Sequence, residues 1–175
     1  DQQIRLSTDK LFLPIQGSVT QLTYLPALDQ SDWSQRMAAL PVLATVLEQN
    51  SSVSSVYVGY HSGDFMQLRP LFDDAARQRW LAPANARYAL DIIDRQQQPL
   101  RYQRFYFDKQ RQQLGNAPIA GKPLDPTQRP WFVQAQKDAS LIVTEPYVFY
   151  QSGDAGITLA QNTSSHRSEE RRVGK

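Results

Sequence analysis

The sequence predicts an α+β domain, in which an antiparallel sheet with flanking helices follows a long N-terminal helical segment. A change of period carries this prediction. Up to about residue 50 the apolar residues recur with helical spacing, and from Val53 onward they alternate with a period of two, as in half-buried strands. The hydrophobic content of 41% and the aromatic content of 10% are typical of a folded domain and argue against disorder.

Two helices are expected in the first fifty residues. The first has an apolar stripe formed by Leu11, Ile15, Leu22 and Leu25. Pro14 and Gly17 should weaken or kink it. The second, capped by Ser31 or Asp32, carries Met37, Leu40, Leu43, Val46 and Leu47. Pro41 should bend or restart this second helix.

The alternating part predicts a series of strands. A strand over residues 56–60, a turn at 61–64 and a return strand over 65–68 form a hairpin. Further elements follow: a short helix at 73–80, strands at 88–92 and 102–108, a loop-rich stretch at 115–130, a helix at 131–137, and closing strands at 142–150 and 157–160. Three aspartates at strand borders, Asp91, Asp94 and Asp108, are expected in solvated turns. Asp73-Asp74 should form a helix N-terminus.

The chain divides into residues 1–50, a helical stalk with a second helix, and residues 51–161, a sheet module. Residues 162–166 are unassigned. Residues 167–175 resemble the translation of a sequencing adapter and are set aside as an artefact. This tail holds four of the 19 Lys and Arg and two of the 17 Asp and Glu, so the net charge of +2 belongs to it. The basic balance therefore gives little support to a nucleic-acid partner.

Composition narrows the function classes further. The chain has no cysteine, which removes disulfides, thiol catalysis and cysteine-based zinc sites. This fits a bacterial extracytoplasmic domain. No stretch approaches eighteen consecutive apolar residues, and there is no start methionine or signal peptide, so a membrane anchor is expected outside this sequence. No cofactor is expected.

The sequence contains none of the common motifs of catalytic or metal-binding sites. The two histidines, His61 and His166, lack the spacing of a zinc site, and no metal site is expected. No Gly-x-Ser-x-Gly elbow supports a nucleophilic triad, and no glycine loop would cradle a phosphate. The basic residues between Arg95 and Arg111 are dispersed through a strand hairpin rather than clustered for nucleic acid. We therefore expect no catalytic residue in this chain.

The segment Arg129-Pro-Trp-Phe132 is better suited to recognition than to catalysis. A guanidinium presents a fixed fork of donors that matches a carboxylate, and a flanking indole can shield that pair from water. Each residue also has a structural explanation. Arg129 could pair with Asp125 or Glu145, Trp131 could be core packing, and Tyr147 could be a core strand residue with its hydroxyl on backbone.

Several motifs in order resemble the double-Cache family, the PAS-like extracytoplasmic input domains of bacterial transmembrane receptors. They are Val56-Tyr-Val-Gly-Tyr60, Gly63-Asp-Phe65, Asp125-Pro-Thr-Gln-Arg-Pro-Trp-Phe132, Thr144-Glu-Pro-Tyr-Val-Phe149 and Gly156-Ile-Thr158. The resemblance covers roughly residues 1–161 and is similar to sensors attached to cyclases or to cyclic-dinucleotide phosphodiesterases. It implies a Cache fold, here truncated at its C-terminal side.

The resemblance also implies a ligand site. In the amino-acid-binding branch of the family, Arg129, Trp131 and Tyr147 fall on pocket residues. At two positions where this branch has a tyrosine, the chain has Phe132 and Leu124 instead. The aspartate that binds the amine would fall beyond Gln161. The carboxylate half of the site is thus better preserved than the ammonium half, which favours a carboxylate or another small anion.

The sequence therefore predicts a periplasmic, ligand-sensing input domain of an inner-membrane receptor. Arg129 would hold a carboxylate, Trp131 and Phe132 would wall the pocket, and Tyr147 would donate a hydrogen bond. The expected partners are an amino acid, organic acid or other small anion and a second copy of the chain in a homodimer, with no nucleic acid. The alternative is a Cache domain without a small ligand, which dimerises or docks a periplasmic protein; Leu124 and Phe132 favour it.

Overall fold

The computed structural model describes residues 2–163, with side chains from Lys10 and from Phe12 onward. His166, the suspected tail and the side chain of Leu11 lie outside the described residues. The chain forms two compact units: Asp1–Ala39 with Gln128–Lys175, and Leu40–Thr127. The predicted α+β class is confirmed by a five-stranded antiparallel sheet accompanied by several helices.

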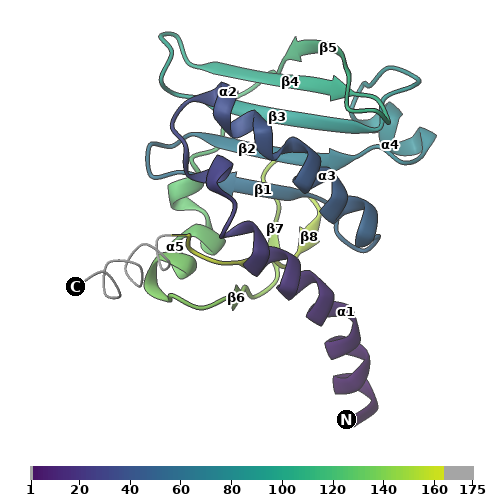
Figure 1. Cartoon of the computed structure of the whole chain (residues 1–175), viewed down its shortest axis with the longest axis vertical. Helices are drawn as coiled ribbons and strands as arrows, with labels where there is room; N and C mark the ends of the chain where they lie inside the picture. The colour runs from purple at the N-terminus through teal and green to yellow at the C-terminus, as the bar shows by residue number, and fades with distance from the viewer. Residues whose placement is uncertain (1, 164–175) are drawn as a thin grey trace. The chain divides into compact units, whose positions relative to one another are not determined.

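The unit Leu40–Thr127 is built on that sheet (Figure 1). Its strands follow one another as a meander, in the order β1-β2-β3-β4-β5 with every neighbouring pair antiparallel. They are β1 (Val56–Gly59), β2 (Phe65–Pro70), β3 (Tyr88–Asp94), β4 (Arg101–Phe107) and β5 (Gln113–Pro118). Strands β1 to β4 lie where the alternating pattern predicts them.

Strand β5 corrects the prediction of a loop from Gly115 onward. Its sequence, Gln-Leu-Gly-Asn-Ala-Pro, is poor in strand formers. It nevertheless pairs with β4, with Phe105 opposite Asn116 and Gln103 opposite Pro118. An edge strand tolerates proline and glycine because only one of its sides needs ladder hydrogen bonds. The pairing with β4 therefore overrides the local preference.

The hairpin between β1 and β2 turns at residues 61–64, as predicted. Gly63 has φ +86°, a left-handed conformation that favours glycine, and a Cβ there would lie 2.8 Å from Cδ of Arg95. Asp64 is completely buried and accepts hydrogen bonds from the backbone N–H of Arg95 and from Nε2 of Gln96. The turn is thus fastened to the end of β3.

Helix α3 (Leu40–Gln49) packs on one face of the sheet, against β1 and β2. Pro41 is its second residue, where a missing N–H costs nothing, so the predicted restart at this proline is confirmed. The helix buries Leu40, Leu43, Ala44 and Leu47. On β3, Tyr88 reaches Glu48 of this helix, and Leu90 and Ile92 share its face by alternation.

The other face of the sheet carries α4 (Asp74–Arg79) and the residues after it. Asp73 caps this helix by accepting from the N–H of Ala76 at 2.7 Å, which confirms Asp73-Asp74 as a helix N-terminus. A small apolar cluster formed by Leu71, Ala86, Ala89 and Tyr106 is packed by Ala76, Trp80, Ala82 and Leu114. Because both faces are covered, all seven residues of β3 are buried.

The second unit contains α1 (Gln2–Leu22), η1 (Pro26–Asp29), α2 (Trp33–Arg36), η2 (Met37–Ala39), α5 (Pro130–Lys137) and two small ribbons, with η3 (Pro126–Gln128) at the boundary between the units. Asp32 caps α2 through the N–H of Ser34, as predicted. Pro14 lies inside α1 without ending it. None of the helices in the described part of the chain is long and apolar enough to cross a membrane.

The predicted strands after residue 142 are shorter than expected. β6 (Ile142–Val143) pairs with β9 (Leu159–Ala160), and β7 (Tyr147–Val148) pairs with β8 (Ala155–Gly156). The proposed single strand 142–150 is interrupted at residues 144–146, where Pro146 lacks a donor. Thr20 of α1 donates to Oε1 of Gln161 at 2.9 Å, which joins α1 to the residues after β9.

The contact between Tyr88 and Glu48 predicts a loss of stability in alkali. Burial and the hydrogen bond to the Glu48 carboxylate raise the pKa of Tyr88 from 10.0 to about 12. Between these values the unfolded tyrosine ionises while the folded one stays neutral, so the stabilisation present below pH 10 is lost as pH rises to about 12. We expect a decrease in the free energy of unfolding on the order of 2 kcal/mol across this range. Urea denaturation at several pH values measures it. Tyr88→Phe, which cannot ionise, should show a correspondingly smaller decrease, and an unchanged decrease would contradict the assignment.

Candidate functional site

Arg129 lies immediately before α5, in an extended backbone conformation at the helix N-cap. Pro130 follows as the first helical residue and fixes the helix start. The guanidinium is partly exposed and lies beside the ribbon of β7 and β8. Its Nη2 donates to the carbonyl of Val148 at 3.1 Å. Its central carbon lies 5.6 Å from the ring centroid of Tyr147 and 5.7 Å from that of Tyr150.

Among the described residues of its own unit, no carboxylate pairs with Arg129. Of the two acidic partners suggested by the sequence, Glu145 forms no ion pair with it in the described residues of that unit, and Asp125 belongs to the other unit. Two aromatic rings and one carbonyl stabilise the cation instead. A guanidinium held in this way retains donors for an incoming anion.

Trp131 and Phe132 are buried on α5 rather than displayed. Their exposed fractions are 8% and 6%, and their rings meet edge to face with centroids 5.7 Å apart. Ala135, one turn further along, is buried as well. The two rings hold α5 in place within this unit, and this is the core-packing role that the sequence left open for Trp131.

Tyr147 is engaged through both its ring and its hydroxyl. The ring packs edge to face on Phe149 with centroids 5.2 Å apart, and the hydroxyl lies 2.5 Å from Oγ1 of Thr158. Thr158 in turn is paired with Thr144 through its N–H and its carbonyl. The sequence left two partners open for this hydroxyl, a bound ligand or a backbone group; in the structure it lies beside the side chain of Thr158.

Strand β8 of this ribbon contains a closely packed glycine, Gly156. A Cβ on Gly156 would lie 2.5 Å from Cζ of Phe149, so the ring of Phe149 occupies the space that any side chain would fill. The motif glycine of Gly156-Ile-Thr158 thus permits the close packing of β8 on the residues after β7.

The structure therefore brings together two of the four predicted site residues, Arg129 and Tyr147, and adds Tyr150. Trp131 and Phe132 form a separate buried pair on the same helix. Leu124 is buried in the other unit. Within the described residues there is no group of three or more His, Asp or Glu side chains that could hold a metal ion.

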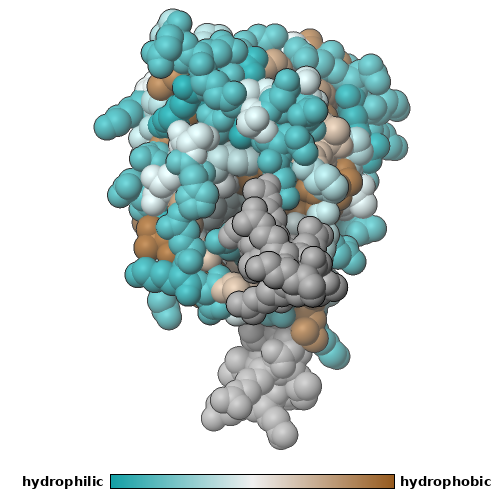
Figure 2. All heavy atoms as spheres, turned by 60° about the vertical axis from the view of Figure 1, so that its left-hand side comes forward, coloured by the Kyte–Doolittle hydropathy of each residue, from teal (hydrophilic) through white to brown (hydrophobic). Residues whose placement is uncertain are grey.

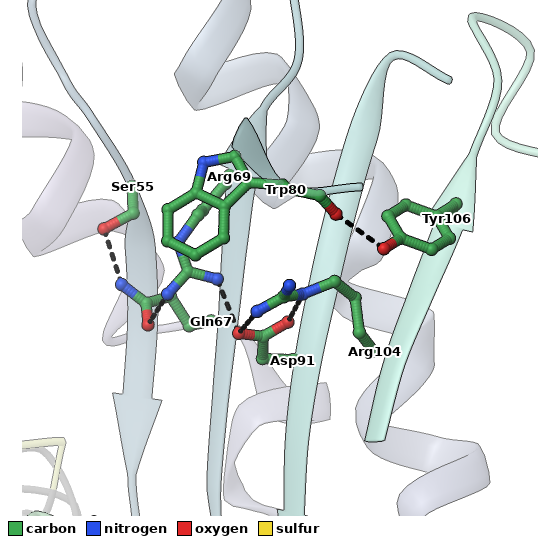
Figure 3. A network of polar contacts seen from close by, with 7 residues as sticks. All are labelled: Ser55, Gln67, Arg69, Trp80, Asp91, Arg104 and Tyr106. Atoms are coloured by element: carbon green, nitrogen blue, oxygen red, sulfur yellow. Dashed lines mark hydrogen bonds and ion pairs between the residues drawn. The ribbon is translucent and has the colours of Figure 1, made fainter. Parts of the chain in front are cut away.

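A second polar cluster, missed by the sequence analysis, lies on the α4 face of the sheet (Figure 3). Asp91 of β3 accepts from Arg69 of β2 at 2.6 Å. Arg104 of β4 donates to the same carboxylate twice, from Nε at 2.6 Å and from Nη2 at 2.9 Å. We call Arg69, Asp91 and Arg104, together with the indole of Trp80, the Trp80 cluster.

The strand register explains why these residues meet. Asp91 is directly opposite Gln67 on one side and Arg104 on the other, so the three side chains lie in one row across the sheet. Arg69, two residues after Gln67, reaches the row diagonally and also donates to Gln67 at 2.8 Å. The expectation that Asp91 and Asp94 lie in solvated turns is wrong, because both are buried, with exposed fractions of 0% and 2%. Asp108 does lie in a turn and accepts from the N–H groups of residues 110 and 112.

Trp80 covers the arginines. The guanidinium carbons of Arg69 and Arg104 lie 4.1 Å and 4.9 Å from its ring centroid, and its carbonyl accepts from the hydroxyl of Tyr106 at 2.6 Å. Burial lowers the pKa of Arg69. Burial alone would also lower the pKa of Arg104, but its hydrogen bonds to Asp91 and the charge of that carboxylate raise it overall.

One feature of the sequence pointed to this cluster. Asp91 interrupts an apolar strand between Leu90 and Ile92, and a buried carboxylate needs a cationic partner. Arg104 and Tyr106 alternate with Phe105 along β4, so both lie on the face of the sheet that carries Asp91. The register that places Asp91 between two arginines could not be obtained from one sequence.

The face of the molecule drawn in Figure 2 shows no large continuous patch of apolar side chains. Hydrophilic residues predominate there, and hydrophobic ones lie in separated groups. The most exposed large apolar side chains in the described residues include Leu81 at 85%, Tyr24 at 64% and Val148 at 61%. Val148 and Tyr150, at 47%, adjoin Arg129.

The chain is similar to part of one curated protein. It is 30% identical over 121 residues to adenylate cyclase 1 of Rhizobium meliloti (strain 1021), a match that covers 69% of this chain and 18% of that protein. The chain thus spans less than a fifth of the length of this curated relative. No family model matches the sequence, and no solved structure matches it.

Proposed function

We propose that this chain is a small-molecule sensing domain of the double-Cache type, the input part of a membrane receptor. Its similarity to part of an adenylate cyclase supports a role in signalling. The ordered motifs around Arg129 and Tyr147 support the family assignment. In this proposal the domain is periplasmic, and a catalytic output belongs to a longer protein.

The observation that carries the proposal is the environment of Arg129. The guanidinium lies beside two tyrosine rings, and its polar partner among the described residues is a backbone carbonyl rather than a carboxylate. A carboxylate or other small anion would complete this arrangement, accepting a pair of parallel hydrogen bonds from the fork. The rings of Tyr147 and Tyr150 would limit the access of water to that pair.

The remaining predicted residues take supporting roles in this proposal. Trp131 and Phe132, buried on α5, anchor the helix that follows Arg129 and so fix where the guanidinium lies. Tyr147, held by Thr158, keeps its ring beside the cation. These two contacts reduce the entropy that Arg129 would otherwise lose on binding.

Signalling would follow from a difference in affinity between two conformations of the domain. A ligand shifts such an equilibrium only by the amount that it prefers one state. We propose that α1, which is joined to the end of the ribbon region through Thr20 and Gln161, carries the shift toward the membrane within a homodimer.

Arg129→Ala tests the site. A screen by thermal shift over amino acids, organic acids, amines and purines identifies a stabilising compound, because a ligand of the folded state raises its stability with concentration. We expect a carboxylate to raise the melting temperature of the wild type, and Arg129→Ala to weaken binding of that compound by roughly 10- to 100-fold, the value of one or two charged hydrogen bonds.

Lys137→Ala is the matched control, since it removes one positive charge from the last turn of the same helix. It should bind the compound as the wild type does. If Arg129→Ala binds as tightly as Lys137→Ala, the role assigned to Arg129 is wrong.

A second candidate function is a Cache domain that binds a protein partner or a second copy instead of a small ligand. Three of the four predicted site residues favour it, since Trp131 and Phe132 are buried and the hydroxyl of Tyr147 already contacts Thr158. Sedimentation of the chain with and without the compounds separates the two. Self-association together with no thermal response to any compound would favour this candidate.

A further inference from the structure

The Trp80 cluster carries more positive than negative charge. Arg69 and Arg104 share the carboxylate of Asp91, so these three residues together have a net charge of +1. A third guanidinium, that of Arg79, lies 5.4 Å from the centroid of the Trp80 ring. The net positive charge of Arg69, Asp91 and Arg104 lies beside the indole and attracts an anion.

Because the cluster is buried, its net positive charge is only weakly screened by water. The side chain of Asp91 is 1% exposed and that of Arg69 is 6% exposed, so little water screens their interaction. Electrostatic attraction is several times stronger in such surroundings than in bulk water. A charge removed from water is stabilised when a partner of opposite sign accepts its hydrogen bonds.

Arg104 is the accessible member of the trio. Its side chain is 13% exposed, more than that of either Arg69 or Asp91. Its two hydrogen bonds to Asp91 fix the plane of the guanidinium, and Trp80 lies over it at 4.9 Å. An anion that arrives from solvent therefore meets a guanidinium whose orientation is already set, which lowers the entropy cost of binding.

We propose that the Trp80 cluster is a binding site for a small oxoanion, that is, for a carboxylate or phosphate group, which contacts Arg104 and is flanked by Trp80. Asp91 is not a ligand in this site. It holds the two guanidinium groups in place and keeps the net charge at +1 rather than +2. The site lies in the unit Leu40–Thr127 and does not depend on the function proposed for Arg129.

Side-chain NMR of the whole chain tests the proposal. The indole N–H of Trp80, assigned by its loss in Trp80→Phe, is followed during titration with sodium phosphate and, separately, with sodium acetate. Sodium chloride keeps the ionic strength constant and serves as the blank. We expect a saturable shift with at least one of the two oxoanions, and the arm that saturates at lower concentration identifies the preferred group.

Arg104→Gln should weaken this response at least tenfold. Arg101→Gln is the matched control, because it removes the same charge from the same strand, where Arg101 pairs with Asp94 at 3.7 Å. It should leave the response unchanged. If Arg104→Gln does not fold by circular dichroism, Arg104→Lys replaces it; lysine keeps the charge and loses the fork, and we again expect weaker binding.

Three results would overturn the proposal. One is the absence of a saturable shift with either oxoanion. Another is equal binding in the Arg104 and Arg101 variants. The third is loss of the Trp80 response in Arg129→Ala, which would mean that the two sites are not independent. Failure of Arg129→Ala to weaken carboxylate binding would contradict the proposed function and leave the response of Trp80 intact.

Discussion

Replacing Asp91 with alanine is expected to lower the free energy of unfolding by about 3–5 kcal/mol. The substitution leaves the guanidinium groups of Arg69 and Arg104 side by side without the carboxylate that accepts three of their hydrogen bonds. Removing one partner of a buried ion pair is costly because the remaining charge stays out of water. Urea denaturation followed by circular dichroism measures the change.

Asp74→Ala is the control for this prediction. Asp74 also pairs with an arginine, at 2.7 Å from Nη2 of Arg77, but its side chain is 89% exposed. An exposed pair of this kind contributes less than about 1 kcal/mol. A loss for Asp91→Ala as small as that for Asp74→Ala would show that water reaches the Trp80 cluster freely, and the charge argument for an anion site would then fail too.

Trp131→Ala is expected to lower the free energy of unfolding by about 3–5 kcal/mol as well. The indole is 8% exposed and meets the ring of Phe132 edge to face, so its removal leaves a cavity on the buried side of α5. The sequence left two roles open for this residue, a wall of the ligand site or a part of the core. The structure predicts that its loss is felt in stability even when no ligand is present.

Val133→Ala on the same helix is the control. The side chain of Val133 is 37% exposed, so this substitution should lower the free energy of unfolding by less than about 1 kcal/mol. If Trp131→Ala retained wild-type stability and lost only the response to ligand, the tryptophan would be a ligand contact and the core-packing role would be wrong. Comparing this variant with Arg129→Ala separates loss of packing from loss of recognition.

These outcomes bear on how the domain would work. A site that depends on one arginine, held by a buried helix and a fastened ribbon, would be sensitive to small movements of either. Binding would then favour the conformation in which Arg129 and the tyrosine rings are correctly placed. A domain that only docks a protein would show the same stability changes without any thermal response to carboxylates.

Local signals in the sequence predicted much of the fold. Asp32 and Asp73 were recognised at helix N-termini, Pro41 as a restart and residues 61–64 as a turn, and each has that role in the structure. These predictions succeeded because a cap, a proline and a left-handed glycine act on their own backbone and need no distant partner. The alternation from Val56 onward located four of the five strands for the same reason.

The sequence-based predictions were wrong where the structure of a segment depends on a partner far away in the sequence. Strand β5 has weak intrinsic preference and exists because β4 offers it a ladder of hydrogen bonds. The strand expected over 142–150 became two short pieces, each paired with a different partner. Strand propensity is largely a preference for a surface that other strands supply, so it is a poor guide where that surface is unknown.

The sequence alone was enough to predict the α+β class, four of the five strands of the sheet, and Arg129 and Tyr147 as candidates for anion recognition. The folded structure was needed to show that Trp131 and Phe132 are buried, that Arg129 lies beside Tyr147 and Tyr150, and that Asp91 joins Arg69 to Arg104. The first group depends on the period and chemistry of neighbouring residues. The second depends on strand register and on the packing of side chains far apart in sequence, and both are set by contacts that form only when the chain folds.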